Sequence, residues 1–69
     1  MKEEMYVIAT RGRNNKEIYL ACSDKGMIWT ENIDDAMATF SYTETENCAK
    51  NYFKTYNKWY IKSYLANFS

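Results

Sequence analysis

Residues 5–30, with the sequence MYVIATRGRNNKEIYLACSDKGMIWT, decide the fold of this chain. Three segments in this stretch are rich in β-forming residues and predict strands: 5–10, 17–22 and 27–30. The segments 11–16 and 23–26 between them contain Gly and Asn, which tolerate the positive φ of a hairpin connection. The stretch therefore predicts an antiparallel meander of three strands.

A helix is expected after the meander. Residues 31–36 have the residue types of caps and turns, and they predict a loop or a single helical turn. Residues 43–46, TETE, fit a capping box. In it the Thr43 side-chain oxygen accepts from an amide of the first turn, and the Glu46 side chain accepts from the amide of Thr43. A helix beginning there runs to residue 56, and it presents an apolar stripe to the sheet: Ala49, Tyr52, Phe53 and Tyr56.

The last segment, residues 58–65, admits two structures. Its β-branched and aromatic content favours a fourth strand. The helical spacing of Tyr56, Tyr60, Ser63 and Tyr64 would instead continue the helix. With the strand favoured, residues 1–69 are predicted to form a single α+β domain. In this domain one helix packs on an antiparallel sheet of three to four strands, and the elements follow along the chain in the order β-β-β-α-β.

Residues that could catalyse a reaction or bind a metal are scarce. The 69-residue chain has no histidine, which is the commonest general base and metal ligand. Its two glycines stand apart, so they form no phosphate-binding loop. The acids Glu31, Asp34 and Asp35 lack the spacing of a calcium loop. We therefore expect no enzyme activity, no metal and no cofactor.

The two cysteines, Cys22 and Cys48, are far apart in the sequence and form no C-x-x-C motif. Cys22 follows Ile18 and Leu20 at alternate positions of a predicted strand, so the three share one face. No apolar N-terminal run has the length of a signal peptide or a membrane span. We therefore expect a cytoplasmic protein without a membrane partner, in which both cysteines are buried as small hydrophobic side chains.

Acidic and basic residues are separated along the chain, although the net charge is zero. Residues 27–49 contain no Lys or Arg and hold five acids: Glu31, Asp34, Asp35, Glu44 and Glu46. Such carboxylates could bind a basic nucleic-acid channel of a partner protein by imitating phosphates. They are equally typical of residues at the start of a helix.

The C-terminal third offers a second charged surface, because residues 50–69 hold four lysines and no acid. Its lysines recur at i+4 spacing among aromatic residues, and together they define the lysine surface: Lys50, Lys54, Lys58, Tyr52, Tyr56 and Trp59. Cations on phosphates beside stacking rings are what single-stranded nucleic-acid binding requires. The same pattern describes a solvated helix face beside a buried aromatic stripe.

The order of these features resembles that of a class of small phage and prophage proteins. The shared layout is YVI at residues 6–8, YL at 19–20, WT at 29–30, then Ala36 with Phe40 shortly after it, then a helix. The resemblance covers roughly residues 5–56 and implies a compact sheet with one helix packed across it. Some small phage proteins of this kind inhibit host defence, including anti-CRISPR proteins, but the resemblance carries over no functional residues.

These observations lead to one main hypothesis and two alternatives. The main hypothesis is a phage-encoded inhibitor of a host defence complex, such as a CRISPR effector, that binds stoichiometrically in the host cytoplasm through the five acids. The first alternative is a small nucleic-acid-binding module that uses the lysine surface. The second is a homo-oligomeric structural protein whose exposed aromatic residues pair across a two-fold axis.

Overall fold

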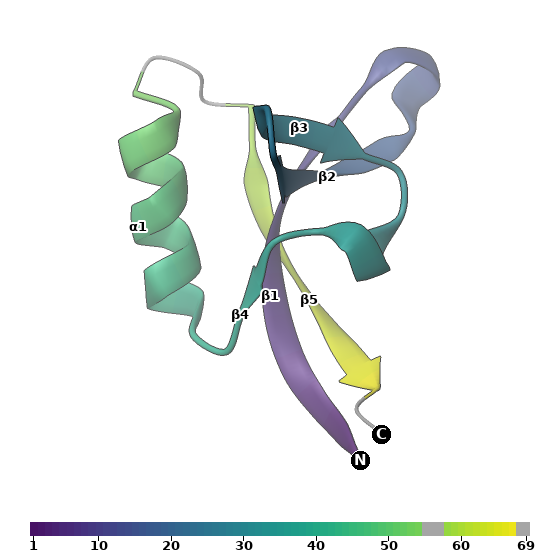
Figure 1. Ribbon diagram of the computed structural model, residues 1–69, viewed down its shortest axis with the longest axis vertical. Helices are drawn as coiled ribbons and strands as arrows, with labels where there is room; N and C mark the ends of the chain where they lie inside the picture. The colour runs from purple at the N-terminus through teal and green to yellow at the C-terminus, as the bar shows by residue number, and fades with distance from the viewer. Residues whose placement is uncertain (55–57, 68–69) are drawn as a thin grey trace.

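The computed structural model describes residues 1–54 and 58–67 and contains one antiparallel sheet with one α-helix beside it (Figure 1). The strands and the helix follow in this order: β1 (Lys2–Arg11), β2 (Glu17–Ser23), β3 (Gly26–Thr30), β4 (Ala38–Thr39), α1 (Tyr42–Tyr52) and β5 (Tyr60–Asn67). Single 3-10 turns, η1 (Arg13–Asn15) and η2 (Ile33–Asp35), connect β1 to β2 and β3 to β4. The predicted α+β class with one helix on an antiparallel sheet is confirmed.

The first strand, β1, is the centre of the sheet. One edge of β1 pairs with β5 without interruption, from Lys2 opposite Asn67 to Ala9 opposite Tyr60. Its other edge pairs first with the two-residue β4 and then with β2, and β2 in turn pairs with β3. The predicted meander of β1, β2 and β3 is therefore present. The favoured strand at the C-terminus is also confirmed, whereas β4 is a strand that the sequence did not predict.

The connections in the meander use the residues expected of them. In the first connection Asn14 and Asn15 have positive φ angles, of 62° and 60°. In the second, Gly26 has a φ of 111°, a conformation that glycine adopts without steric cost. The Ser23 hydroxyl donates to the Gly26 carbonyl oxygen at 2.9 Å and closes this tight turn. Local residue preferences therefore account for both hairpin connections.

The core is built around β1, because four consecutive residues of this strand, Val7 to Thr10, are buried. Successive side chains of a strand point to opposite faces, so β1 is covered on both sides. On the helix side Ile8 packs with Leu20 of β2 and Ala49 of α1, and partly buried Met, Trp and Phe side chains surround this cluster. Such a small cluster is what a chain of this length can bury.

The helix begins two residues earlier than predicted. Ser41 is its N-cap, and the Ser41 Oγ accepts from the amide of Glu44 at 3.3 Å. The capping box predicted at Thr43 and Glu46 is therefore wrong. The physical reason lies in β4, because Thr39 at its end bonds both the backbone of Ser41 and the hydroxyl of buried Thr45, which sets where the helix begins.

The predicted apolar stripe of the helix is correct only in part. Ala49 is buried, and Phe53, which caps the helix C-terminus, stacks on Trp29. Tyr52 is instead 51% exposed, at the edge of the groove described below. The helix ends at Tyr52, and Tyr56 lies outside the described residues.

The two cysteines are both exposed, so the prediction that they are buried is wrong. Cys22 pairs with Met27 next to the β2–β3 turn, beyond the part of β2 that the core covers. Cys48 lies beside buried Ala49 on α1, but its side chain faces the groove described below. Both are free thiols.

Candidate functional site

A groove lies between α1 and the β2–β3 hairpin. It has a volume of about 280 Å³ and is lined by six residues: Leu20, Met27, Met37, Cys48, Asn51 and Tyr52. These come from β2, β3, the segment before β4, and α1, so residues up to 32 positions apart (20 to 52) meet in it. The lining is mostly apolar, which is typical of a site that receives a hydrophobic group.

The two walls of the groove are held by defined contacts. On the segment before β4, the Met37 amide donates to the Leu20 carbonyl oxygen at 2.9 Å and fixes this segment against β2. At the helix end, Trp29 and Phe53 stack with ring centroids 5.7 Å apart and planes 10° apart. Tyr52 meets Phe53 edge-on at 4.9 Å, so the rim continues the aromatic packing of the core.

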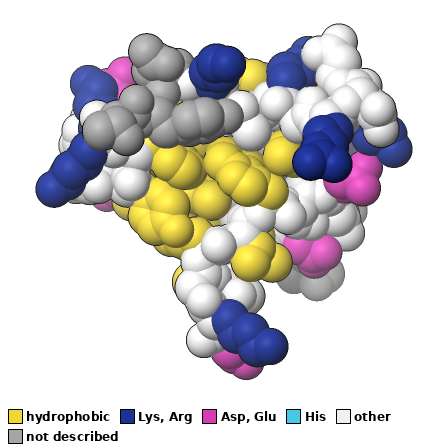
Figure 2. Space-filling model, turned by 90° about the horizontal axis from the view of Figure 1, so that it is seen from above, with side chains coloured by type: hydrophobic (Ala, Val, Ile, Leu, Met, Phe, Trp, Pro, Cys, Tyr) yellow, Lys and Arg dark blue, Asp and Glu magenta, His cyan; other side chains and the backbone are white. Residues whose placement is uncertain are grey.

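The residues that line the groove suit an apolar group. Two methionines line it, and methionine side chains adapt their shape to different apolar partners. Asn51 and Tyr52 add an amide and a hydroxyl at its edge, which can orient a bound chain through hydrogen bonds. Figure 2 shows hydrophobic side chains gathered in one continuous area on this side of the molecule, with charged side chains around it.

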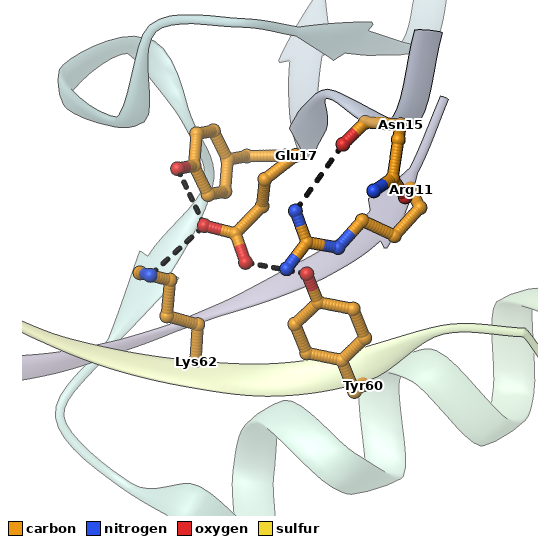
Figure 3. Close-up of polar contacts among 6 residues, drawn as sticks. Arg11, Asn15, Glu17, Tyr60 and Lys62 are labelled. Carbon is orange, nitrogen blue, oxygen red and sulfur yellow. Dashed lines mark hydrogen bonds and ion pairs between the residues drawn. The ribbon is translucent and has the colours of Figure 1, made fainter. Parts of the chain in front are cut away.

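A second cluster of interest lies on the sheet face opposite the helix side, where Glu17 is surrounded by hydrogen-bond donors (Figure 3). The Glu17 Oε1 accepts from the Tyr19 hydroxyl at 2.9 Å and lies 2.9 Å from the Lys62 Nζ. The Tyr60 hydroxyl donates to Glu17 Oε2. We call these four residues, from β2 and β5, the Glu17 cluster.

Strand register explains why the Glu17 cluster forms. Ala9 of β1 lies opposite Tyr19 on one edge and opposite Tyr60 on the other. The side chains of paired residues share one face of a sheet, and the small buried Ala9 leaves room for a tyrosine ring on each side. Glu17 precedes Tyr19 by two residues and Lys62 follows Tyr60 by two, so both side chains lie on this same face. Their charged groups meet at 2.9 Å, and the cluster therefore joins β2 to β5 across β1.

Ionisation in the Glu17 cluster follows from these contacts. The hydrogen bond from Tyr60 and the Lys62 ammonium lower the pKa of Glu17 to about 2, against an opposing effect of burial. Burial and the Glu17 carboxylate raise the pKa values of Tyr19 and Tyr60, and the same carboxylate raises the pKa of Lys62. Each group is therefore held in its ordinary neutral-pH form. The cluster is suited to linking strands and unsuited to proton transfer.

The five predicted partner-binding acids fall in two places: Glu31, Asp34 and Asp35 at and just before η2, and Glu44 and Glu46 on α1. Figure 1 shows η2 and α1 on opposite sides of β4. Glu31 lies 3.3 Å from the ammonium of Lys16, and Glu46 lies 3.7 Å from that of Lys50. Their role in binding a partner stays a prediction, which the structure separates into two surfaces.

The lysine surface does not form one helical face, because α1 ends at Tyr52. Lys50 lies in the helix, whereas Lys54 follows it and Lys58 precedes β5, where its carbonyl oxygen accepts from the Thr10 hydroxyl at 3.0 Å. Trp59 packs against the core cluster, and Tyr56 lies outside the described residues. Lys50, Lys54 and Lys58 therefore do not share one helix, and their role in binding nucleic acid stays a prediction.

The sequence missed most of the groove. Leu20, Met27 and Met37 are ordinary apolar residues in the sequence, and only the packing of α1 brings them together. For the Glu17 cluster a signal was present: Glu17 with Tyr19, and Tyr60 with Lys62, occupy alternate positions in two segments expected to be strands. What the sequence lacked was the register that places one pair opposite the other.

Two further classes of site were sought in the described part of the chain. Residues 1–54 and 58–67 bring together no group of three or more Cys, Asp or Glu side chains that could hold a metal ion. Across the same residues, α1 is too short and too polar to cross a membrane. Comparison with family models, curated proteins and solved structures finds no match to this chain, so function has to be argued from the sites themselves.

Proposed function

We propose that the protein acts by binding a partner protein stoichiometrically, with an apolar side chain of the partner seated in the groove between α1 and the β2–β3 hairpin. The observation that carries this proposal is the groove itself, of about 280 Å³, with an apolar lining and a rim of exposed side chains. A buried apolar anchor in a pocket is how many protein interfaces obtain most of their binding energy.

The partner we propose is a host defence complex, with a CRISPR effector as the leading candidate and inhibition as the result. The layout shared with small phage proteins supports this choice. The Glu17 cluster also supports a binding role over a catalytic one, because its only carboxylate is already bonded to three donors. None of the six described residues that line the groove is a base that could pair with the Cys48 thiol.

The experiment compares groove variants with a matched helix variant. Tyr52→Glu and Cys48→Glu place a carboxylate at exposed positions of the groove, so they change its polarity without removing a core side chain. Thr43→Glu puts the same charge on an exposed position of α1 outside the groove. We expect each groove variant to bind and inhibit at least about tenfold more weakly, because a carboxylate is poorly accommodated among apolar groups. The control should behave as wild type.

The assay measures binding and inhibition across a panel of purified CRISPR effectors and other defence nucleases. Groove and control variants that inhibit equally would contradict the use of the groove. Reversing the charge of all five acids tests the surface predicted from the sequence. Unchanged inhibition in that variant would exclude imitation of phosphates by these carboxylates.

A further inference from the structure

The ribbon formed by β1 and β5 has two exposed edges of different character. Beyond β4, residues 2–5 of β1 pair only with residues 64–67 of β5. Figure 1 shows these ends of the two strands extending past α1 and the rest of the sheet, with the N-terminus at the tip. Along its whole length β5 pairs only with β1, so among the described strands none occupies its outer edge.

The β1 edge of the ribbon carries the charges that protect exposed strands from pairing. Lys2, Glu3 and Glu4 are consecutive and exposed there. Charged side chains on an edge strand discourage the docking of another strand, because pairing would bury or crowd them.

The β5 edge lacks this protection. Residues 64–67 of β5, with the sequence YLAN, carry no charge, and Leu65 is 64% exposed. The single charged residue of β5 is Lys62, whose ammonium is held 2.9 Å from Glu17 on the face of the sheet. The strand also pairs with β1 in one uninterrupted register of eight residues and contains no proline, so no bulge or break blunts its edge.

We infer that the outer edge of β5 pairs with the β5 of a second copy of this chain. Antiparallel pairing across a two-fold axis perpendicular to the sheet places residues of the same parity opposite each other. Centred on Tyr64, such a pair sets Leu65 against Ser63 and Lys62 against Ala66 of the second copy. No like charges meet in this register, and the pairing closes on itself and so ends at a dimer.

The alternative pairing within the same ribbon is less favourable. Docking the β5 edge on the β1 edge of another copy would bring an uncharged strand against Lys2, Glu3 and Glu4. That contact is also head-to-tail and would propagate into a filament. The charge difference between the two edges therefore selects the two-fold dimer.

The size of the contact sets the expected strength. An edge-to-edge strand pair without a second packed layer is below the size of a standard interface, so we expect a dissociation constant of about 10–100 µM. Analytical ultracentrifugation from about 10 µM to about 1 mM covers this range. The average mass of the wild-type protein is expected to rise toward two monomer masses as the concentration increases across this range.

Two matched lysine substitutions identify the edge. Leu65→Lys adds a charge to the exposed β5 edge, whereas Ile28→Lys makes the corresponding change at a 48% exposed position of β3, the other terminal strand of the sheet. We expect at least about a tenfold weaker dimer for Leu65→Lys and wild-type association for Ile28→Lys. Ser63→Lys, also exposed on β5, provides a second variant, and circular dichroism verifies the fold of each.

Three results would overturn the inference. Wild-type protein that stays monomeric throughout would show that this edge does not pair with a second copy. A dimer that survives both β5 substitutions would lie elsewhere on the surface. Loss of the dimer in Ile28→Lys alone would transfer the contact to β3.

Discussion

Replacing Glu17 by glutamine is the most informative perturbation of this fold. The carboxylate joins β2 to β5 by accepting from Tyr19 and Tyr60 and by pairing with Lys62. Glutamine has nearly the same shape, but it removes the negative charge and replaces one acceptor oxygen by a donor. The substitution therefore tests the charge of the cluster with little change in packing.

The magnitude follows from the pKa of Glu17. A value of about 2 in the folded protein, against 4.5 for the free side chain, corresponds to about 3 kcal/mol, since one pKa unit is worth about 1.4 kcal/mol. The Glu17 side chain is still 18% exposed, so water screens part of this interaction. We expect Glu17→Gln to lower the free energy of unfolding by about 1.5 kcal/mol at neutral pH, or about 6–12 °C in Tm.

The pH dependence has a definite sign. Because the folded protein depresses the pKa of Glu17, the stabilisation is fully present above about pH 4.5 and is lost as the pH falls toward 2. The assay is urea denaturation followed by circular dichroism at a series of pH values from neutral to acid. Wild type and Glu17→Gln should differ most above pH 4.5, and the difference should close at the acid end of this window.

The control for Glu17→Gln is Glu31→Gln. Glu31 lies 3.3 Å from Lys16, but both side chains are 68% exposed, and such surface pairs contribute about 0–1 kcal/mol. We expect Glu31→Gln to have only a small effect on the free energy of unfolding at neutral pH. A Glu17→Gln loss no larger than that of the control, or a wild-type pH profile in Glu17→Gln, would refute the role assigned to the cluster.

Three further predictions concern packing, capping and reactivity. Ala9→Leu should lower the free energy of unfolding, measured by urea denaturation, by about 1–3 kcal/mol, because the buried Ala9 methyl group lies between the strand positions of Tyr19 and Tyr60. Wild-type stability in this variant would show that there is room for a larger side chain. Ser41→Ala should lower the free energy of unfolding by about 1 kcal/mol, and Thr43→Ala should lower it clearly less, because Ser41 caps α1. Thermal melting measures both variants, and a larger loss in Thr43→Ala would identify Thr43 as the cap. Both free cysteines should react with a thiol reagent in the native protein, because both are exposed. A partner seated in the groove should protect Cys48 from the reagent. Slow labelling that requires unfolding would contradict the exposure of the cysteines.

The meander and the C-terminal strand were predictable because their causes are local. Positive φ angles at Asn14, Asn15 and Gly26 are intrinsic preferences of those residues, and they set two hairpin connections without help from the rest of the chain. The β-forming content of residues 58–65 was likewise sufficient to favour β5 over a longer helix. Even so, capping residues were abundant near the helix start, and only the contacts of Thr39 distinguish Ser41 from Thr43.

Local sequence features were sufficient for the class of the fold, the strand order of the meander and the scarcity of catalytic residue types. Tertiary structure decided the groove, the exposure of both cysteines and the Glu17 cluster. Each of these depends on which residues lie opposite one another across strands and layers: Ala9 between Tyr19 and Tyr60 is the clearest case. Register and packing arise from the whole core at once, and no local preference of a single segment encodes them.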